Sequence, residues 1–221
     1  PALGYSPYER TNAAKYGSRE AWAKAAVERL RGWGLNTIGA WSTPEAEKQK
    51  MAYAPILDLA AASVPDLWLK GGFPDVYSPG FAAAMDAAAK RLCTPLVKDP
   101  WLLGYFTDNE LHWGPDWRSD DSVLDLYLKM AEDAPGRKKA EAFLAERGRK
   151  PGEQTEGDEA TFLEKAAGEY FRHCKEAVRR HDPNHLILGC RFAGFPPEPV
   201  IRAIGKHTDI VSVNDYDRNA P

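Results

Sequence analysis

The sequence predicts an α/β fold in which short parallel strands alternate with helices. Apolar runs of strand length alternate with stretches of helical periodicity, and the strand runs show almost no polar–apolar alternation. Such strands are typical of a parallel sheet covered by helices on both faces. An open doubly wound sheet and a (β/α) barrel both fit this pattern. No GxGxxG or GxxxxGK[ST] loop, which the open nucleotide-binding sheet would need, is present.

The first predicted helix follows Ser18, a favourable N-cap residue, and ends at Gly34. Trp22 and Trp33 lie on its apolar face at helical spacing, so we assign both to the core. The short, β-branched run that follows, residues 35–41, predicts a strand.

The alternation continues along the rest of the chain. Residues 52–59 predict a second strand, in which Pro55 cannot donate a hydrogen bond to a neighbouring strand. The remaining predicted elements are strands at 101–106, 186–190 and 209–214, helices at 79–92, about 120–131, 137–147 and 159–181, and a short helix after Pro197.

Polar and aromatic side chains directly follow several of these strands. They are Trp41-Ser42, Asp108-Asn109-Glu110, Arg191-Phe192 and Asn214-Asp215-Tyr216. Functional side chains at the carboxyl ends of several strands are typical of a barrel active site. We therefore favour the (β/α) barrel over the open sheet.

Charge and hydropathy exclude several classes of protein. Thirty-two acidic and 29 basic residues give a net charge of −3, without the basic excess that a nucleic-acid partner would require. No apolar run approaches the roughly 20 residues needed to cross a bilayer, so no membrane partner is expected. The start of the chain shows no signal peptide.

The three cysteines, Cys93, Cys174 and Cys190, are too scattered for a disulfide framework. We expect them to be small buried hydrophobic residues. No CxxC, HExxH or Cys/His cluster is present, so neither a metal nor a cofactor is expected.

The strongest chemical motif is the run from Asp108 to Trp113 at the end of an apolar strand. Asp108 and Glu110 should point to one side of the strand, and local twist can bring Asn109 to the same mouth as Glu110. A carboxylic acid at the rim of a dry, aromatic cleft keeps its proton more readily and can donate it. A neighbouring amide can hold a sugar hydroxyl. The simpler alternative is that these residues only end the strand and cap the next turn.

Five segments carry a resemblance to one known group of enzymes: residues 29–42, 73–77, 98–110, 188–192 and 209–216. An Asn-Glu pair at the end of the fourth strand marks the clan of retaining glycoside hydrolases built on the (β/α)8 barrel. Within that clan the five segments resemble family 50, the β-agarases. The resemblance spans nearly the whole chain in the right order.

This resemblance implies hydrolysis of a β-linked galactan of the agarose type by a retaining mechanism, with an oligo- or polysaccharide as partner. Glu110 would be the general acid/base, and Asn109 would hold the hydroxyl next to the reacting carbon. Residues around the cleft would contact the sugar: Asp75, Asp108, His112, Arg191, Asn214 and Tyr216 through polar groups, and Trp41, Trp113 and Phe192 by stacking. Ordinary packing is the alternative for the three aromatic residues, and a buried ion pair for Arg191.

Against the eight strands of the family, the sequence contains about six, so residues 1–221 are expected to form one incomplete barrel domain. The family's nucleophile, a glutamate on the seventh strand, has no matching position. If the chain is a fragment, the missing strand lies outside it, in a bacterial enzyme that is secreted or periplasmic. If the chain is whole, its open edges would be covered in a homo-oligomer. It would then be a saccharide-binding or assembly scaffold, or a remnant with another hydrolytic activity, such as ester cleavage, that uses Glu110, His112 or Asp108. In a whole but truncated chain, Asp215 or Asp217 could also substitute as a nucleophile or base.

Overall fold

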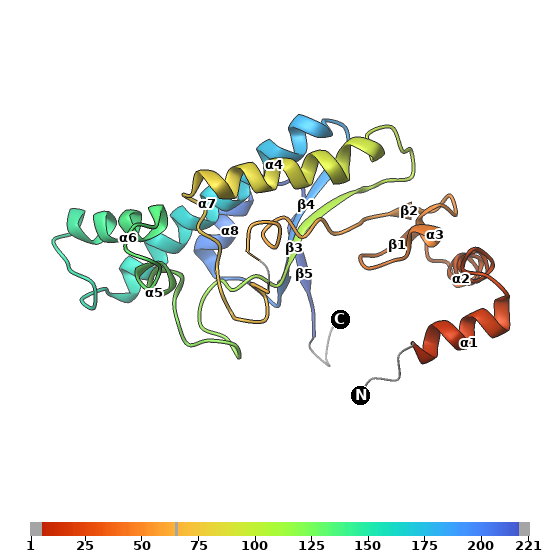
Figure 1. Ribbon diagram of the computed structural model, residues 1–221, viewed down its shortest axis with the longest axis horizontal. Coiled ribbons are helices and arrows are strands. Elements are labelled where there is room, and N and C mark those ends of the chain that lie inside the picture. The colour runs from red at the N-terminus through yellow and green to blue at the C-terminus, as the bar shows by residue number, and fades with distance from the viewer. Residues whose placement is uncertain (1–5, 65, 217–221) are drawn as a thin grey trace. The chain divides into compact units, whose positions relative to one another are not determined.

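A computed structural model describes residues 6–64 and 66–216 of the chain, which form helices and short, mostly parallel strands (Figure 1). The chain divides into two compact units, residues 1–55 with 99–104, and residues 56–98 with 105–221. The single barrel domain expected for residues 1–221 stays a prediction. Asp217 lies outside the described residues.

The first unit starts with helices α1 (Pro7–Tyr16) and α2 (Arg19–Gly32). Ser18 caps α2 as predicted, because its Oγ accepts a hydrogen bond from the backbone N–H of Ala21 at 3.1 Å. Trp33 follows the last turn of α2 and is 69% exposed, so its assignment to the core is wrong. A residue at the C-cap has left the helical path and no longer shares the buried face.

Two short strands complete this unit around α3 (Pro44–Glu47). β1 (Thr37–Ile38) pairs in parallel with β2 (Ala52–Tyr53). Tyr53 also forms a parallel bridge with Leu102. The unit's buried apolar side chains come from α2, α3, the two strands and the residues next to them, and the segment 99–104: Ala23, Val27, Ile38, Ala46, Met51, Tyr53, Ala54 and Leu102.

Pro55 divides the strand predicted over residues 52–59. The part before it belongs to the first unit. The part after it belongs to the second unit, where the N–H of Leu57 donates to the carbonyl of Phe106 at 2.9 Å. Because proline lacks an N–H group, pairing cannot run continuously through this position.

The second unit contains most of the predicted helices and strands. Its elements in chain order are α4 (Pro79–Cys93), a 3₁₀ turn η1 (Thr94–Leu96), β3 (Gly104–Asn109, with Gly104 assigned to the first unit), α5 (Val123–Leu128), α6 (Pro135–Glu146), α7 (Glu156–His181), β4 (Leu186–Ala193), α8 (Glu198–Ile204) and β5 (Ser212–Asn214). The strands form one sheet in the order β3-β4-β5. β4 and β5 run parallel, with Arg191 opposite Ser212.

Helix α7 supplies the centre of this unit's core. Five residues at helical spacing form its apolar face, and all five are fully buried: Phe162, Ala166, Tyr170, Cys174 and Val178. Helices α4 and α8 both contact α7 (Figure 1). Burying each large apolar side chain stabilises the fold by about 1.5–3 kcal/mol, so this face is the main source of stability for the unit.

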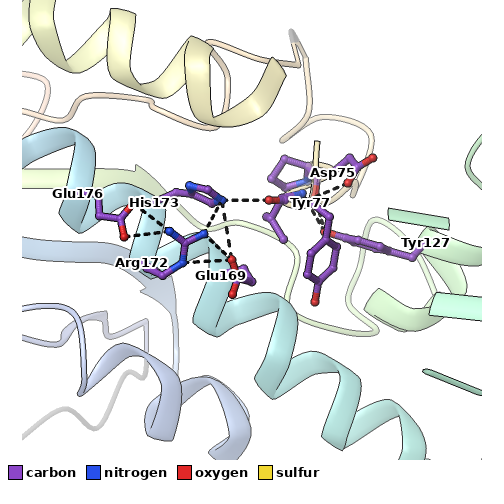
Figure 2. A network of polar contacts seen from close by, with 9 residues as sticks. Asp75, Tyr77, Tyr127, Glu169, Arg172, His173 and Glu176 are labelled. Atoms are coloured by element: carbon purple, nitrogen blue, oxygen red, sulfur yellow. Dashed lines mark hydrogen bonds and ion pairs between the residues drawn. The ribbon is translucent and has the colours of Figure 1, made fainter. Parts of the chain in front are cut away.

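A network of polar contacts fixes the segment before α4 against α5 and α7 (Figure 2). The hydroxyl of Tyr127 donates to the carbonyl of Pro74 at 2.6 Å and accepts from the N–H of Val76 at 3.1 Å. His173 Nε2 lies 3.1 Å from the carbonyl of Val76. Arg172 bridges Glu169 and Glu176 on the surface of α7.

The mixed helix and strand content agrees with the predicted α/β class. Two strand pairs, β1 with β2 and β4 with β5, are parallel. Closure of the strands into a barrel stays a prediction. No helix among the described residues is long and apolar enough to cross a membrane.

Candidate active site

The candidate active site lies where β3, β4 and β5 of the second unit end. Asn109 is the last residue of β3, and Glu110 follows with a positive φ of +48°. A left-handed backbone costs a non-glycine residue about 1–2 kcal/mol, so other contacts must hold it. One of them is a hydrogen bond of 2.7 Å from the N–H of Glu110 to the carbonyl of Arg191 on β4.

Two donors from the end of β5 meet one oxygen of the Glu110 carboxylate. Asn214 Nδ2 donates to Glu110 Oε1 at 2.8 Å, and the hydroxyl of Tyr216 donates to the same oxygen. The bond to Glu110 raises the pKa of Tyr216, because the phenol is held as a donor. The carboxylate therefore has a fixed orientation, with Oε1 occupied by two neutral donors.

The amide of Asn109 belongs to the same cluster. Its Oδ1 lies 3.3 Å from Arg191 Nη1 and 3.4 Å from Asn214 Nδ2. Because these contacts hold the amide oxygen of Asn109, they also fix the direction in which its amide nitrogen points. Five residues proposed from the sequence are thus brought together: Asn109, Glu110, Arg191, Asn214 and Tyr216.

A hollow of about 420 Å³ lies beside Glu110, between the loops that follow β3 and β4. Two aromatic side chains on its wall, Trp117 and Phe195, are 77% and 94% exposed. Their exposed ring surfaces suit the apolar face of a sugar ring. The sequence analysis did not propose either residue. The one feature of the sequence that could have indicated them is that each lies in a loop that follows a strand.

Trp113 and Phe192 also reach this hollow, but they are 7% and 1% exposed. Trp113 stacks on Phe171 with ring centroids 5.4 Å apart, and Phe192 packs against Trp113 at 5.8 Å. The expectation that both are stacking platforms is therefore corrected: their faces are occupied by other aromatic side chains.

Asp108 and His112 are corrected in the same way, because both are buried. Asp108 is 3% exposed and accepts hydrogen bonds from the N–H of Ala60 at 2.9 Å and from the hydroxyl of Tyr170 at 2.5 Å. His112 is 0% exposed, with Nε2 at 2.8 Å from the carbonyl of Asp121. The left-handed Glu110 ends the strand's alternation, so Asp108 faces the core while Glu110 faces the mouth.

Asp75 has a structural position away from this cluster. Its carboxylate accepts a hydrogen bond from the N–H of Tyr77 at 3.1 Å (Figure 2). It also accepts one from the N–H of Gly136, at the start of α6, at 2.9 Å. Both oxygens are thus used by the backbone, which corrects its assignment as a sugar contact. Trp41 belongs to the other unit, is 64% exposed and has a φ of +60°; its stacking role stays a prediction.

No family profile matches the chain. Among curated proteins, it is 26% identical to beta-agarase B of Vibrio sp. (strain JT0107) over 96% of this chain. Identity to beta-agarase A of the same organism is 24% over 95% of this chain. The chain spans about a quarter of these relatives, 26% and 25% of their lengths.

Solved structures show the same likeness. The agarase AgWH50C is 29% identical over 96% of this chain, with a TM-score of 0.76, and the chain covers 34% of it. The chain resembles the β-agarases of glycoside hydrolase family 50. Two further structures share the fold: BpGH50, at 22% identity and a TM-score of 0.80, and an exo-beta-agarase, at 24% and 0.79. The match to BpGH50 includes 96% of this chain and 51% of BpGH50. The match to the exo-beta-agarase includes 98% of this chain and 35% of that structure.

Two other features of this agarase-like chain bear on its chemistry. All three cysteines are free and buried, as predicted, and burial raises their pKa values, so none is a ready nucleophile. Across residues 6–64 and 66–216, no group of three or more His, Cys, Asp or Glu side chains is placed to hold a metal ion.

Proposed function

We propose that this chain carries the acid/base part of a glycoside hydrolase that cleaves agarose-type β-linked galactan with retention of configuration. One observation carries the proposal: Glu110 stands at the strand ends with its carboxylate held by Asn214 and Tyr216 and with Asn109 beside it. The likeness to beta-agarases along 96% of the chain supports the substrate class.

Glu110 would protonate the glycosidic oxygen as the bond to the leaving sugar breaks. Donors on Oε1 fix that oxygen, which leaves Oε2 as the natural site for the transferable proton. In the second half of the reaction the same group, now ionised, would take a proton from water. The donors on Oε1 stabilise this ionised form without moving.

Asn109 would bind the hydroxyl next to the reacting carbon. Its Oδ1 already faces Arg191 and Asn214, so the amide nitrogen is oriented before substrate arrives. A hydrogen bond to this hydroxyl strengthens as positive charge builds on the sugar ring in the transition state. Preorganised groups of this kind lower the barrier because they need not reorganise during the reaction.

Retention also requires a nucleophile with its carboxyl about 5–5.5 Å from the acid/base. The resembled family carries it on a seventh strand, which has no counterpart in these 221 residues. We therefore propose that the parallel strands belong to a (β/α)8 barrel and that sequence beyond this chain supplies the nucleophile. Trp117 and Phe195 would stack on sugar rings in the hollow next to Glu110.

The test is Glu110→Gln in the full-length protein, assayed with two aryl galactosides that differ only in the acidity of the phenol, and with agaro-oligosaccharides. The expected result is a loss of about 10²–10⁴-fold in kcat/KM for the oligosaccharide and the poorer phenol, and a much smaller loss for the better one. Glu198→Gln on α8, 82% exposed, is the matched control.

Equal losses on both phenols would remove Glu110 as the acid. Binding of agaro-oligosaccharides without any turnover, unchanged by Glu110→Gln, would favour a saccharide-binding scaffold instead.

A further inference from the structure

We propose that Arg118 is a positioning residue for this reaction, which holds Glu110 in its left-handed conformation by binding its main-chain carbonyl. The inference rests on the proposed acid/base role of Glu110. It assigns to the loop after β3 a function that neither the sequence motif nor the family likeness assigns.

The guanidinium of Arg118 lies inside the protein and contacts the acid/base residue directly. Its side chain is only 4% exposed. Nη1 donates to the carbonyl of Glu110 at 2.8 Å and to the carbonyl of Trp68 at 3.2 Å. A charged donor makes a stronger bond to a carbonyl than a neutral one, so this contact can offset a strained backbone.

Asp116 completes the arginine's bonding and sets its direction. Its carboxylate accepts from Nη2 at 2.6 Å and from Nε at 3.1 Å, and also from the N–H of Arg118 at 2.7 Å. Burial opposes ionisation of Asp116, but these bonds and the charge of Arg118 outweigh it and lower its pKa to about 2. Asp116 is therefore ionised at neutral pH and holds Nε and Nη2 of Arg118, which leaves Nη1 to point at Glu110.

Two tryptophans enclose the same guanidinium. Its central carbon lies 5.4 Å from the ring centroid of Trp68 and 5.5 Å from that of Trp117. Gly71 leaves the space: a Cβ there would come within 2.8 Å of Arg118 Cβ, and its φ of +58° suits glycine. Arg118 thus connects the exposed sugar-facing Trp117 to the backbone of Glu110.

This connection matters because the backbone of Glu110 has two anchors. Its N–H is bound by Arg191 and its carbonyl by Arg118. If the second anchor is lost, the strained residue can relax toward negative φ, which turns its side chain away from Asn214 and Tyr216. A displacement of about 1 Å at a reacting group costs on the order of 10²-fold in rate.

The experiment compares Arg118→Met and Arg118→Lys in the full-length protein, using the same two aryl galactosides. Met removes every donor, whereas Lys keeps a charge and one donor toward the carbonyl. We expect Arg118→Met to lower kcat/KM by roughly 10²-fold on the poorer leaving group and far less on the better one. Arg118→Lys should fall between this variant and the wild type. Because only the phenol differs, a change in sugar binding affects both substrates equally.

Arg137→Met is the matched control, because Arg137 also joins a carboxylate, Glu141 at 2.9 Å, to a carbonyl, that of Met130 at 3.1 Å. The proposal is overturned if Arg118→Met behaves like Arg137→Met, or if it slows both phenols equally. If Arg118→Met does not fold, Arg118→Lys decides: a wild-type ratio of the two kcat/KM values overturns the proposal, and a lowered ratio supports it. Loss of the leaving-group effect in Glu110→Gln as well would instead refute the proposed function.

Discussion

Replacing Asp108 by asparagine should make the stability of the chain less sensitive to pH. Asp108 is buried beside Tyr170, and this burial raises its pKa to about 8 from the ordinary 3.8, although bonds from Tyr170 and Ala60 act in the opposite direction. The folded protein therefore holds this proton across a pH range in which the unfolded chain has released it. At 1.36 kcal/mol per pKa unit, the linked free energy is on the order of 5 kcal/mol.

The sign follows from a raised carboxyl pKa. Below pH 4 both states are protonated and burial of the acid carries no ionic penalty. Between about pH 4 and pH 8 the unfolded state loses its proton, so the free energy of unfolding of the wild type falls as pH rises. Above pH 8 both states are ionised and the penalty is constant. The asparagine side chain has nearly the same shape as aspartate and does not titrate, so the free energy of unfolding of the variant does not fall with pH for this reason.

Urea unfolding of the wild type and Asp108→Asn at pH 4, 6 and 8 measures the effect. The variant should gain several kcal/mol relative to the wild type between pH 4 and pH 8. Asp120→Asn, on the exposed loop before α5, is the matched control. A difference between wild type and Asp108→Asn that stays constant over this range would refute the argument.

The remaining predictions concern two exposed rings beside Glu110 and one buried acid in the core. Phe195→Ala removes an exposed ring, so it should leave the free energy of unfolding within about 0.5 kcal/mol of wild type. Trp117→Ala also removes the ring's contacts with Arg118 and Trp68, so it should cost about 1 kcal/mol. Each should weaken oligosaccharide binding by roughly 2–10-fold in calorimetry, the value of one stacked ring; unchanged affinity would remove the ring from the binding surface. Asp182→Ala should cost about 3 kcal/mol in urea unfolding, because fully buried Asp182 accepts from the Tyr105 hydroxyl and from His185 Nδ1, both at 2.7 Å. A loss below about 1 kcal/mol would show that water or another group replaces these bonds.

Much of the second unit could be predicted from sequence because its signals are local. Apolar spacing located α4 and α7, and the apolar run at residues 186–190 located β4. Strand ends supplied the central cluster, since the carboxyl ends of neighbouring strands meet at one edge. That rule placed Glu110 and Asn214 together across 104 residues of sequence.

The wrong or missing site residues occur where one backbone angle or the path of one loop determines where a side chain lies. Strand alternation placed Asp108 on the same side as Glu110, but the positive φ of Glu110 breaks the alternation at that residue. Arg118, Trp117 and Phe195 lie in loops that make contacts distant in sequence, such as the bond from Arg118 to the carbonyl of Trp68 and that from the N–H of Gly194 to the carbonyl of Asn214. No periodic pattern reports such contacts, so residue type alone could not find them.

The two donors to Glu110 come from the last described residues, 104 and 106 positions later in the chain. During synthesis Glu110 therefore leaves the ribosome long before Asn214 and Tyr216, which orient its carboxylate. A nascent chain can complete most of its helices and still lack an oriented proton donor until β5 pairs with β4. Local fraying of that strand in the finished protein would have the same effect, and it would disable the site without unfolding the core.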